Sequence, residues 1–414
     1  MLTGAVSLQG ASRVLQVVFT CLGWPGKVPH WTTGRLWLQR LGHARLFEPL
    51  EQADDWAWLI DHSVQIGQDK CLAILGTRLA HLPPPGKCLR PQDMKLVALV
   101  PMRSSTRQEV QEELQRAVPR TGLPRVIAND RGVDLTGGVG FFQQEQQQQH
   151  QGPVPTIEVY DTKHKAACLL KHRLEKDPRW QSFNRQVGQT RSAIQQTELA
   201  FLVPPGPRPK ARFMNLGPLL NWGLKVLAVV TAPSAEVLGW VSRERLQEKL
   251  GWLQEYRAAL AEWGQWQQLV DTAVAWVGLH GLYQGAAADL AKLLPRPLQH
   301  PSSERLAEEL EAFVAEQAQP ARPGERFPGS TEVLESCFGK LKVLERGQAK
   351  GGFTGLLLAF GALLATTTTA LLLAALQASR TKDVRRWCKE VLGTTLPAKR
   401  KAAFQGPTSA TKPG

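Results

Sequence analysis

Three β-rich runs in close succession constrain the fold of this chain most. Residues 56–67 read WAWLIDHSVQIG, residues 69–79 read DKCLAILGTRL and residues 95–102 read KLVALVPM. Each run is rich in strand-forming residues, and short breaks separate the three. The first two meet at Gly67-Gln68, which suits a hairpin. The spacing therefore predicts three consecutive antiparallel strands.

The sequence that follows alternates between helical and extended periodicity. Residues 106–118 have the spacing of an amphipathic helix, residues 125–128 are a short apolar run, and residues 156–161 predict another strand. A basic helix is expected from about Lys163 to Lys176. The order β-β-β-α-β-α-β-α is the layout of the ribonuclease-H fold, so we expect an α/β fold with a ribonuclease-H-like mixed sheet.

A large helical insertion and flanking helical segments are expected around this sheet. The expected parts are a helical N-terminal unit with possible DNA binding (1–50), the first part of the catalytic domain (51–180), a helical insertion (181–325), the last catalytic helix with C-terminal helices (326–396) and a basic disordered tail (397–414). Pro/Gly-rich stretches at 204–209 and 319–329 are interpreted as linkers.

Two segments have an unusual composition. The glutamine-rich stretch within residues 138–153 is interpreted as a flexible loop or a frayed helix end. The tryptophans of the helical block stand at helical spacing among leucines, which favours core positions over base stacking.

The composition indicates a polyanionic partner. The chain has 50 Lys and Arg against 36 Asp and Glu, a net charge of +14, which suits nucleic acid. Six cysteines lie far apart without a CxxC pair, so neither a disulfide framework nor a zinc ribbon is expected. The absence of a signal pattern favours a cytoplasmic location.

An uncharged apolar run at residues 355–376 is long enough to span a bilayer. Four threonines stand at its centre and charged residues crowd both sides, so a buried helical hairpin with the threonines near the break is expected. A membrane anchor is the alternative, and a membrane partner is not expected.

The first residues of the chain suggest two short helices around a turn at 23–26. Thr32 or Thr33 could cap the second helix, which carries Arg35. A helix-turn-helix that binds DNA through Arg35 and an arm that packs on the next domain are both consistent with this pattern.

Asp61 interrupts the apolar strand WLIDHSV. A carboxylate among Leu59, Ile60 and Val64 costs several kcal/mol unless a metal or a charge pairs with it. The alternative is a side chain on the solvent face of an edge strand.

Asp130 ends the short apolar run at 125–128. Carboxylates at the ends of strands with parallel connections are favoured positions for active sites. Asp134 follows, and it could orient Asp130 or cap the next helix.

Glu335 lies near the start of a predicted helix that Ser330 or Thr331 could cap. Lys342 stands two turns later on the same face, where it could reach a phosphate. Glu332, one turn earlier, is the alternative to Glu335.

A cluster of basic residues lies in the helix that follows the last predicted strand. Lys163, Lys165, Lys171 and Arg173 form a run that could bind phosphates or be a solvated face, and His164 could contact the scissile phosphate or be an ordinary residue of the helix start.

Together these residues resemble the DDE transposases of bacterial insertion sequences, in the retroviral-integrase superfamily. The segments WLIDHSVQIGQDKCLAILG, VYDTKHKAACLLKHRLEKD and STEVLESCFGKLK carry the similarity, which covers most of the chain. The long gap between Asp130 and Glu335 is similar to families that insert a helical domain before the last carboxylate. Pro328 and Thr331 stand where one large group has tyrosine and arginine.

The resemblance implies Mg²⁺ or Mn²⁺ bound by Asp61, Asp130 and Glu335, and cleavage of transposon ends followed by joining to target DNA. It also implies double-stranded DNA as the partner, a homodimer on DNA and association with the nucleoid. A ribonuclease-H-like nuclease that only hydrolyses, and a domesticated DNA-binding protein without turnover, remain as alternatives.

Overall fold

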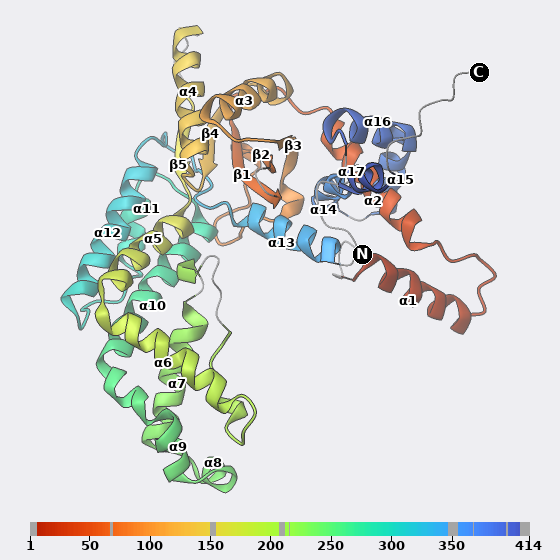
Figure 1. The fold of residues 1–414 in the computed structure, drawn as a ribbon. Helices are drawn as coiled ribbons and strands as arrows, with labels where there is room; N and C mark the ends of the chain where they lie inside the picture. Colours follow the sequence, from red (N-terminus) through yellow and green to blue (C-terminus); the bar gives the residue numbers. More distant parts are fainter. Residues whose placement is uncertain are drawn as a thin grey trace. The chain divides into compact units, whose positions relative to one another are not determined.

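The computed structural model describes residues 6–66, 69–149, 155–206, 212–214, 216–346, 355–366, 368–394 and 396–405 (Figure 1). The chain divides into two compact units. Unit 1 contains Met1–Val159 and Ser330–Gly414, and unit 2 contains Tyr160–Gly329. Unit 1 is therefore discontinuous in sequence, with the whole of unit 2 between its two segments.

A five-stranded mixed sheet forms the centre of unit 1. Its strands are β1 (Trp56–Ile66), β2 (Asp69–Arg78), β3 (Lys95–Met102), β4 (Pro124–Asn129) and β5 (Ile157–Tyr160). Their order is β3-β2-β1-β4-β5; β2 is antiparallel to β1 and β3, and β1 is parallel to β4. The three predicted antiparallel strands are confirmed, while the predicted turn at Gly67-Gln68 lies outside the described residues.

Unit 1 also contains helices and short 3-10 turns, some of which cover the two faces of the sheet. In unit 1 they are α1 (Leu8–Cys21), α2 (Trp31–Phe47), α3 (Arg107–Thr121), α4 (Val133–Gln149), α13 (Glu332–Arg346), α14 (Ala359–Leu363), α15 (Thr369–Ala378), α16 (Thr381–Val391) and α17 (Leu396–Phe404), with the 3-10 turns η1 (Leu79–His81), η2 (Pro91–Asp93) and η6 (Gly355–Leu358).

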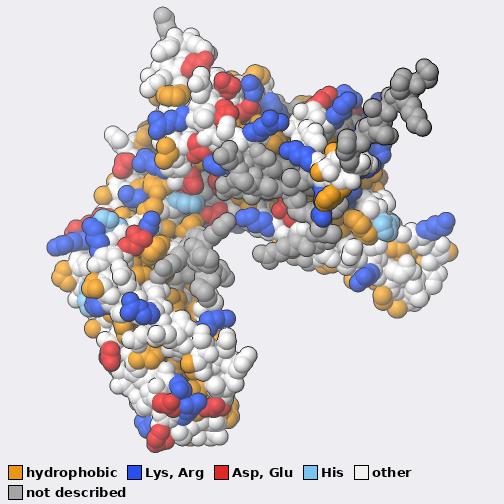
Figure 2. Space-filling view, viewed as in Figure 1, with side chains coloured by type: hydrophobic (Ala, Val, Ile, Leu, Met, Phe, Trp, Pro, Cys, Tyr) orange, Lys and Arg blue, Asp and Glu red, His pale blue; other side chains and the backbone are white. Residues whose placement is uncertain are grey.

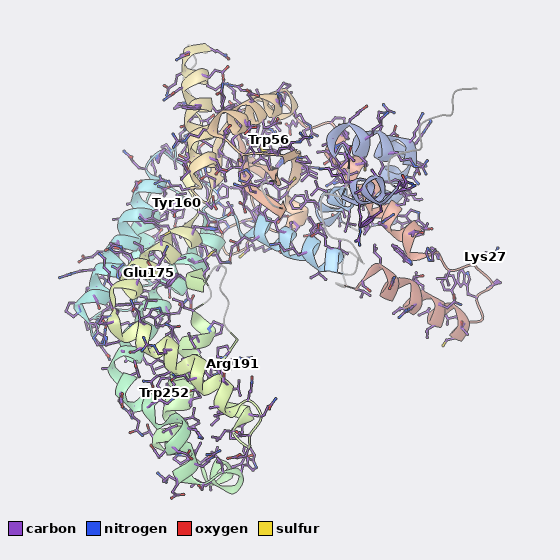
Figure 3. The ribbon with its side chains drawn as sticks, viewed as in Figure 1. Lys27, Trp56, Tyr160, Glu175, Arg191 and Trp252 are labelled. Carbon is purple, nitrogen blue, oxygen red and sulfur yellow. The ribbon has the colours of Figure 1, made fainter. Side chains whose placement is uncertain are left out.

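One face of the sheet packs on α3 and α4. Trp58 and Ile60 of β1 share a buried cluster with Val110 of α3 and with Val139 and Phe142 of α4. Since successive strand residues point to opposite faces, the even-numbered residues of β1 form this core. Trp56, labelled in Figure 3, begins the same series.

The other face packs on α13, α14 and α2. Helix α13 contacts β1 and α14, and α2 contacts β3 and α14. The rings of Phe338 in α13 and Phe360 in α14 lie 5.3 Å apart. This layer joins the second segment of unit 1 to the sheet formed by the first.

Unit 2 is helical. Its helices are α5 (Thr162–Lys176), α6 (Pro178–Ile194), α7 (Gly217–Thr231), α8 (Ala235–Trp240), α9 (Arg243–Leu250), α10 (Arg257–His280), α11 (Ala286–Ala291) and α12 (Pro301–Ala318), with η3 (Ala200–Leu202), η4 (Arg212–Met214) and η5 (Gly251–Tyr256).

Aromatic side chains form much of the core of unit 2. Trp180 and Trp263 are buried and meet edge to face, with ring centroids 5.1 Å apart. Trp252, labelled in Figure 3, donates from Nε1 to the Thr190 hydroxyl at 3.0 Å. The core interpretation of the tryptophans is confirmed for Trp263, Trp266 and Trp276, which are buried, whereas Trp240 is 59% exposed.

Three local expectations are wrong. The glutamine-rich stretch is ordered as helix as far as Gln149, because its amides bond neighbouring elements: Gln143 donates to the Thr156 carbonyl at 2.7 Å. Residues 397–404 of the expected disordered tail belong to helix α17. The N-cap of α2 is His30 rather than Thr32 or Thr33, since the His30 ring accepts from the Thr32 amide.

The apolar run at 355–376 breaks near its threonines, as predicted. Its first half, from Leu356 to Ala365, is buried, but α15 is mostly exposed, with Leu373 at 56%. The expectation that both halves are buried is therefore wrong for the second. Among the described helices, none has the length and apolar character needed to cross a bilayer.

Candidate active site

Asp61 stands in β1, and Asp130 is the first residue after β4, the parallel neighbour of β1. Leu59 of β1 pairs with Ala128 of β4, and the pairing of the two strands ends there. Asp61 and Asp130 therefore each follow the last paired residue of their segment by two positions. Strand β1 is central in the sheet, which excludes the alternative of an edge strand for Asp61.

Alternation along β1 directs Asp61 to the face of Leu59. This face, called the aspartate face below, is the one against which α13 packs. Asp130 lies beyond the end of β4, in the loop that leads to α4, where its carboxylate accepts from the Gly132 amide. Two half-buried carboxylates therefore lie near the end of the β1–β4 pairing, a position where parallel connections favour sites.

The loop after β4 is shaped by its own side chains. The Asp130 carboxylate accepts from the Gly132 amide at 2.8 Å, and the Asn129 side chain accepts from the Arg131 amide at 2.7 Å. Asn129 is fully buried and also donates to Glu158 of β5 at 2.8 Å. Arg131 has a φ of 60°, a left-handed conformation that few side chains adopt. These bonds fix the turn that follows Asp130.

Glu335 lies in the first turn of α13 and is half-buried, whereas Glu332 is exposed. The Thr331 carbonyl accepts from the Glu335 amide at 3.3 Å, and the Ser330 hydroxyl accepts from the Glu332 amide at 3.1 Å. The predicted capping role is therefore shown for the Ser330 side chain, whereas the bond to Thr331 is made by its backbone carbonyl. Its contact with β1 sets Glu335 on the helix that covers the aspartate face.

Carboxylate oxygens are the donors that Mg²⁺ and Mn²⁺ prefer, so the two aspartates fit such an ion in chemistry and in placement. Over the described part of the chain, no three His, Cys, Asp or Glu side chains are gathered closely enough to hold a metal. The structure thus places Asp61 and Asp130 near the end of the β1–β4 pairing, and metal binding by these two residues and by Glu335 goes beyond it.

A polar network that the sequence did not reveal lies beside this pair, on the opposite face of the sheet. The His62 ring bonds the Ser105 hydroxyl at 2.9 Å and lies 3.7 Å from the Asp134 carboxylate. Lys70 of β2 reaches the same carboxylate at 3.2 Å. Asp134 is the second residue of α4 rather than its N-cap, and it ties the start of α4 to β1 and β2. It also lies near Asp130, since a Cβ atom on Gly132 would be 3.1 Å from the Asp134 Oδ1 and 3.2 Å from the Asp130 Oδ1.

Charge and burial oppose one another in this network. Burial lowers the pKa of His62, while the carboxylates of Asp134 and Asp130 act in the other direction. Burial alone would raise the pKa of Asp134, but the Ser105 hydroxyl, His62 and Lys70 together lower it. The lowered pKa of His62 favours its neutral form, and the lowered pKa of Asp134 favours its ionised form.

The predicted phosphate-binding residues fall in both units. Lys342 of α13 is exposed in unit 1, and Arg35 of α2 is half-buried with its guanidinium 5.7 Å from the Trp31 ring centroid. In unit 2, Arg173 pairs with Glu309 at 2.9 Å.

The remaining basic residues of α5 have varied surroundings. Lys171 lies 4.0 Å from Glu175, Lys165 lies 5.7 Å from the Phe313 ring centroid, and Lys163 is half-buried. Asp161 is buried and bonds the His164 ring at 3.1 Å, which supports the helix-start reading of that histidine. Figure 2 shows Lys and Arg side chains scattered over the viewed faces of both units.

Comparison with known proteins adds no relative. No protein-family model matches the chain, and no curated protein matches its sequence significantly.

Proposed function

We propose that this chain is a transposase of the DDE type, with a ribonuclease-H-like catalytic domain that cleaves transposon ends and joins them to target DNA. The observation that carries the proposal is the placement of Asp61 in β1 and of Asp130 directly after β4, its parallel neighbour in the sheet. The strand order β3-β2-β1-β4-β5, with β2 antiparallel to its neighbours, supports the same fold assignment.

Asp61 and Asp130 hold Mg²⁺ or Mn²⁺ in this proposal, and Glu335 completes the ligand set from α13. Bound divalent ions supply an activated attacking oxygen and neutralise the charge at the scissile phosphate. The chain's own residues position the carboxylates: Asn129 fixes the turn that carries Asp130, and α13 presents Glu335 on the aspartate face.

Double-stranded DNA is the proposed partner, both as transposon end and as target. Lys342 stands about 10 Å from Glu335 along the same face of α13, within reach of a neighbouring phosphate. The net charge of +14 favours contact with DNA at several points. We propose a homodimer on DNA, as the resemblance to DDE transposases implies.

A cleavage assay tests the proposal on linear DNA that carries the sequences flanking the coding gene. We expect strand cuts that require Mg²⁺ or Mn²⁺, and their loss in Asp61→Asn, Asp130→Asn and Glu335→Gln. Asp54→Asn is the matched control, because its carboxylate is exposed in unit 1, and Glu332→Gln decides between the two glutamates of α13.

Binding of the ion has a readout that does not depend on turnover. In scanning calorimetry, Mn²⁺ should raise the unfolding temperature of unit 1 in the wild type and in Asp54→Asn, because a ligand of the native state stabilises it. The shift should vanish in Asp61→Asn and Asp130→Asn. Equal shifts in all four proteins would refute the metal site. Binding without cleavage would favour the inactive DNA-binding alternative, and cuts without joining would favour the nuclease.

A further inference from the structure

An open depression of about 600 Å³ lies where α3 and α4 begin. Its lining consists of Ser105, Thr106, Arg107, Gln108, Val133, Asp134 and Phe141. Lys70 pairs in register with Met102, the last residue of β3, so the depression opens at the sheet end where β1 also finishes. Its volume is in the range of sites that hold small ligands or single groups of larger ones.

The side chain of Arg107 lies in this depression, packed against Gly137 of α4. A Cβ atom built on Gly137 of α4 would overlap the Cγ and Cδ atoms of Arg107 and lie 2.7 Å from its Nε. The stem of Arg107 therefore rests on the bare backbone of α4, and any larger residue at 137 would displace it. The guanidinium is exposed, and among the described residues no carboxylate pairs with it and no acceptor bonds it.

Apolar side chains flank the arginine. Val133 and Phe141 lie one turn before and one turn after Gly137, on the same face of α4. Val133 is 73% exposed and Phe141 is 42% exposed, both high for apolar residues beside a hollow. An uncompensated cation between two exposed apolar surfaces suits a ligand that has an anionic group beside a flat ring.

The negative charge of Asp134, which also lines the depression, repels an anionic ligand only weakly. Asp134 is paired with Lys70 at 3.2 Å and lies near the His62 ring, so its charge is largely balanced within the protein. The same network adjoins the loop of Asp130, whose charge acts on His62. The depression therefore adjoins the loop that carries Asp130.

We propose that this depression binds an unpaired nucleotide of a DNA strand. The phosphate pairs with the guanidinium of Arg107, and the base lies against Phe141, since an exposed aromatic face stacks on bases irrespective of sequence. The base must be unpaired, because a base within a duplex offers no free face to Phe141. This inference rests on the proposed function in one respect: it takes DNA as the partner.

Binding in EDTA tests the site apart from catalysis. The probe is a fluorescein-labelled oligodeoxythymidylate of 12 nucleotides, measured by anisotropy over a range of KCl, beside a blunt duplex of equal length. For Arg107→Ala we expect about tenfold weaker binding of the single strand, as for the loss of one charge-assisted hydrogen bond. The slope of log affinity against log salt should become shallower by about 0.7. Duplex binding should change much less.

Two glycine variants separate position from charge. Gly137→Ala keeps Arg107 but moves it, so it should weaken single-strand binding as Arg107→Ala does. Gly140→Ala is the matched control, because a Cβ there meets no described atom within 4 Å and the substitution lies in the same helix. Circular dichroism melting checks that all three variants fold.

Photocrosslinking locates the base. A strand that carries 5-iodouracil should attach to the peptide that contains Phe141, and Phe141→Ala should abolish this adduct. The proposal is overturned if Arg107→Ala binds the strand like the wild type, if Gly137→Ala and Gly140→Ala behave alike, or if single strand and duplex lose affinity equally. Since EDTA removes cleavage, failure of the Asp61 assay would leave these outcomes readable.

Discussion

The crossing of α2 with the segment before α14 depends on Gly42. A Cβ atom on Gly42 would overlap the carbonyl oxygen of Leu358 and lie 2.6 Å from its carbonyl carbon. Gly361 makes the reciprocal approach, since its Cβ would lie 2.8 Å from the Gly42 carbonyl oxygen. Both obstacles are backbone, which no rotamer change can move. Gly42→Ala therefore has to separate the two segments.

The expected cost follows from two opposing effects. Overpacking of a buried contact costs about 1–3 kcal/mol, and the upper end applies here because backbone must shift. Alanine regains about 1 kcal/mol of helix propensity over glycine. We expect Gly42→Ala to lower the free energy of unfolding of unit 1 by about 2 kcal/mol, or roughly 4–8 °C in unfolding temperature.

Gly140→Ala again provides the control, since it gains the propensity term without the clash. In scanning calorimetry the unit 1 transition should fall for Gly42→Ala and rise slightly for Gly140→Ala. The contact also leads to α13 through Phe360 and Phe338, so DNA cleavage should fall with Gly42→Ala. A unit 1 transition that rises in both variants would refute the close approach of α2.

Three further substitutions have defined outcomes. Asn129→Ala should cost about 1–3 kcal/mol by urea denaturation, because Glu158 and a backbone amide lose a buried partner; an unchanged midpoint would contradict this. Arg40→Met should cost about 1–2 kcal/mol and speed proteolysis after α15, whose last carbonyls Arg40 caps; equal cleavage rates would argue against the cap. Asp177→Ala should cost about 1 kcal/mol and remove an acid-sensitive part of unit 2 stability. Burial alone would raise the pKa of Asp177, but Arg179 and a tryptophan N–H lower it below the ordinary value of 3.8. The contribution of Asp177 to the stability of unit 2 is therefore full above pH 3.8 and disappears as the pH falls through the lower native pKa. Parallel curves of melting temperature against pH for the wild type and Asp177→Ala would exclude this contribution.

The sheet was accessible from sequence because its information is local. Each strand is a run of strand-forming residues, and the break between 56–66 and 69–78 is too short for a crossover connection, so the two strands must pair antiparallel. Asp61 was identified for the same reason, since a single carboxylate in an apolar run is visible without a partner. Whether Asp130 lies opposite it depends on the β1–β4 register, which only the structure supplies.

The network around His62 was not accessible, because its members are distant in sequence. Asp134 lies 72 residues after His62, and the pattern around it reads equally well as a helix cap. The order of the glutamine-rich helix was missed for a related reason. Its composition suggests a solvated segment, whereas Gln143 donates to the Thr156 carbonyl, just before β5, and Gln146 donates to the Gln115 side chain of α3. Long-range bonds of this kind leave no periodic signal.

The discontinuity of unit 1 has a consequence during synthesis. The segment with Asp61 and Asp130 leaves the ribosome before unit 2, and about 170 residues of unit 2 follow before α13 begins. At about 5–20 residues per second, this interval lasts roughly 10–30 s. Throughout it, the aspartate face of the sheet has no α13 to cover it, and Glu335 does not yet exist. In the proposed function, a nascent chain therefore carries two of its three acids without the third, and cleavage requires that synthesis has passed unit 2 and reached α13.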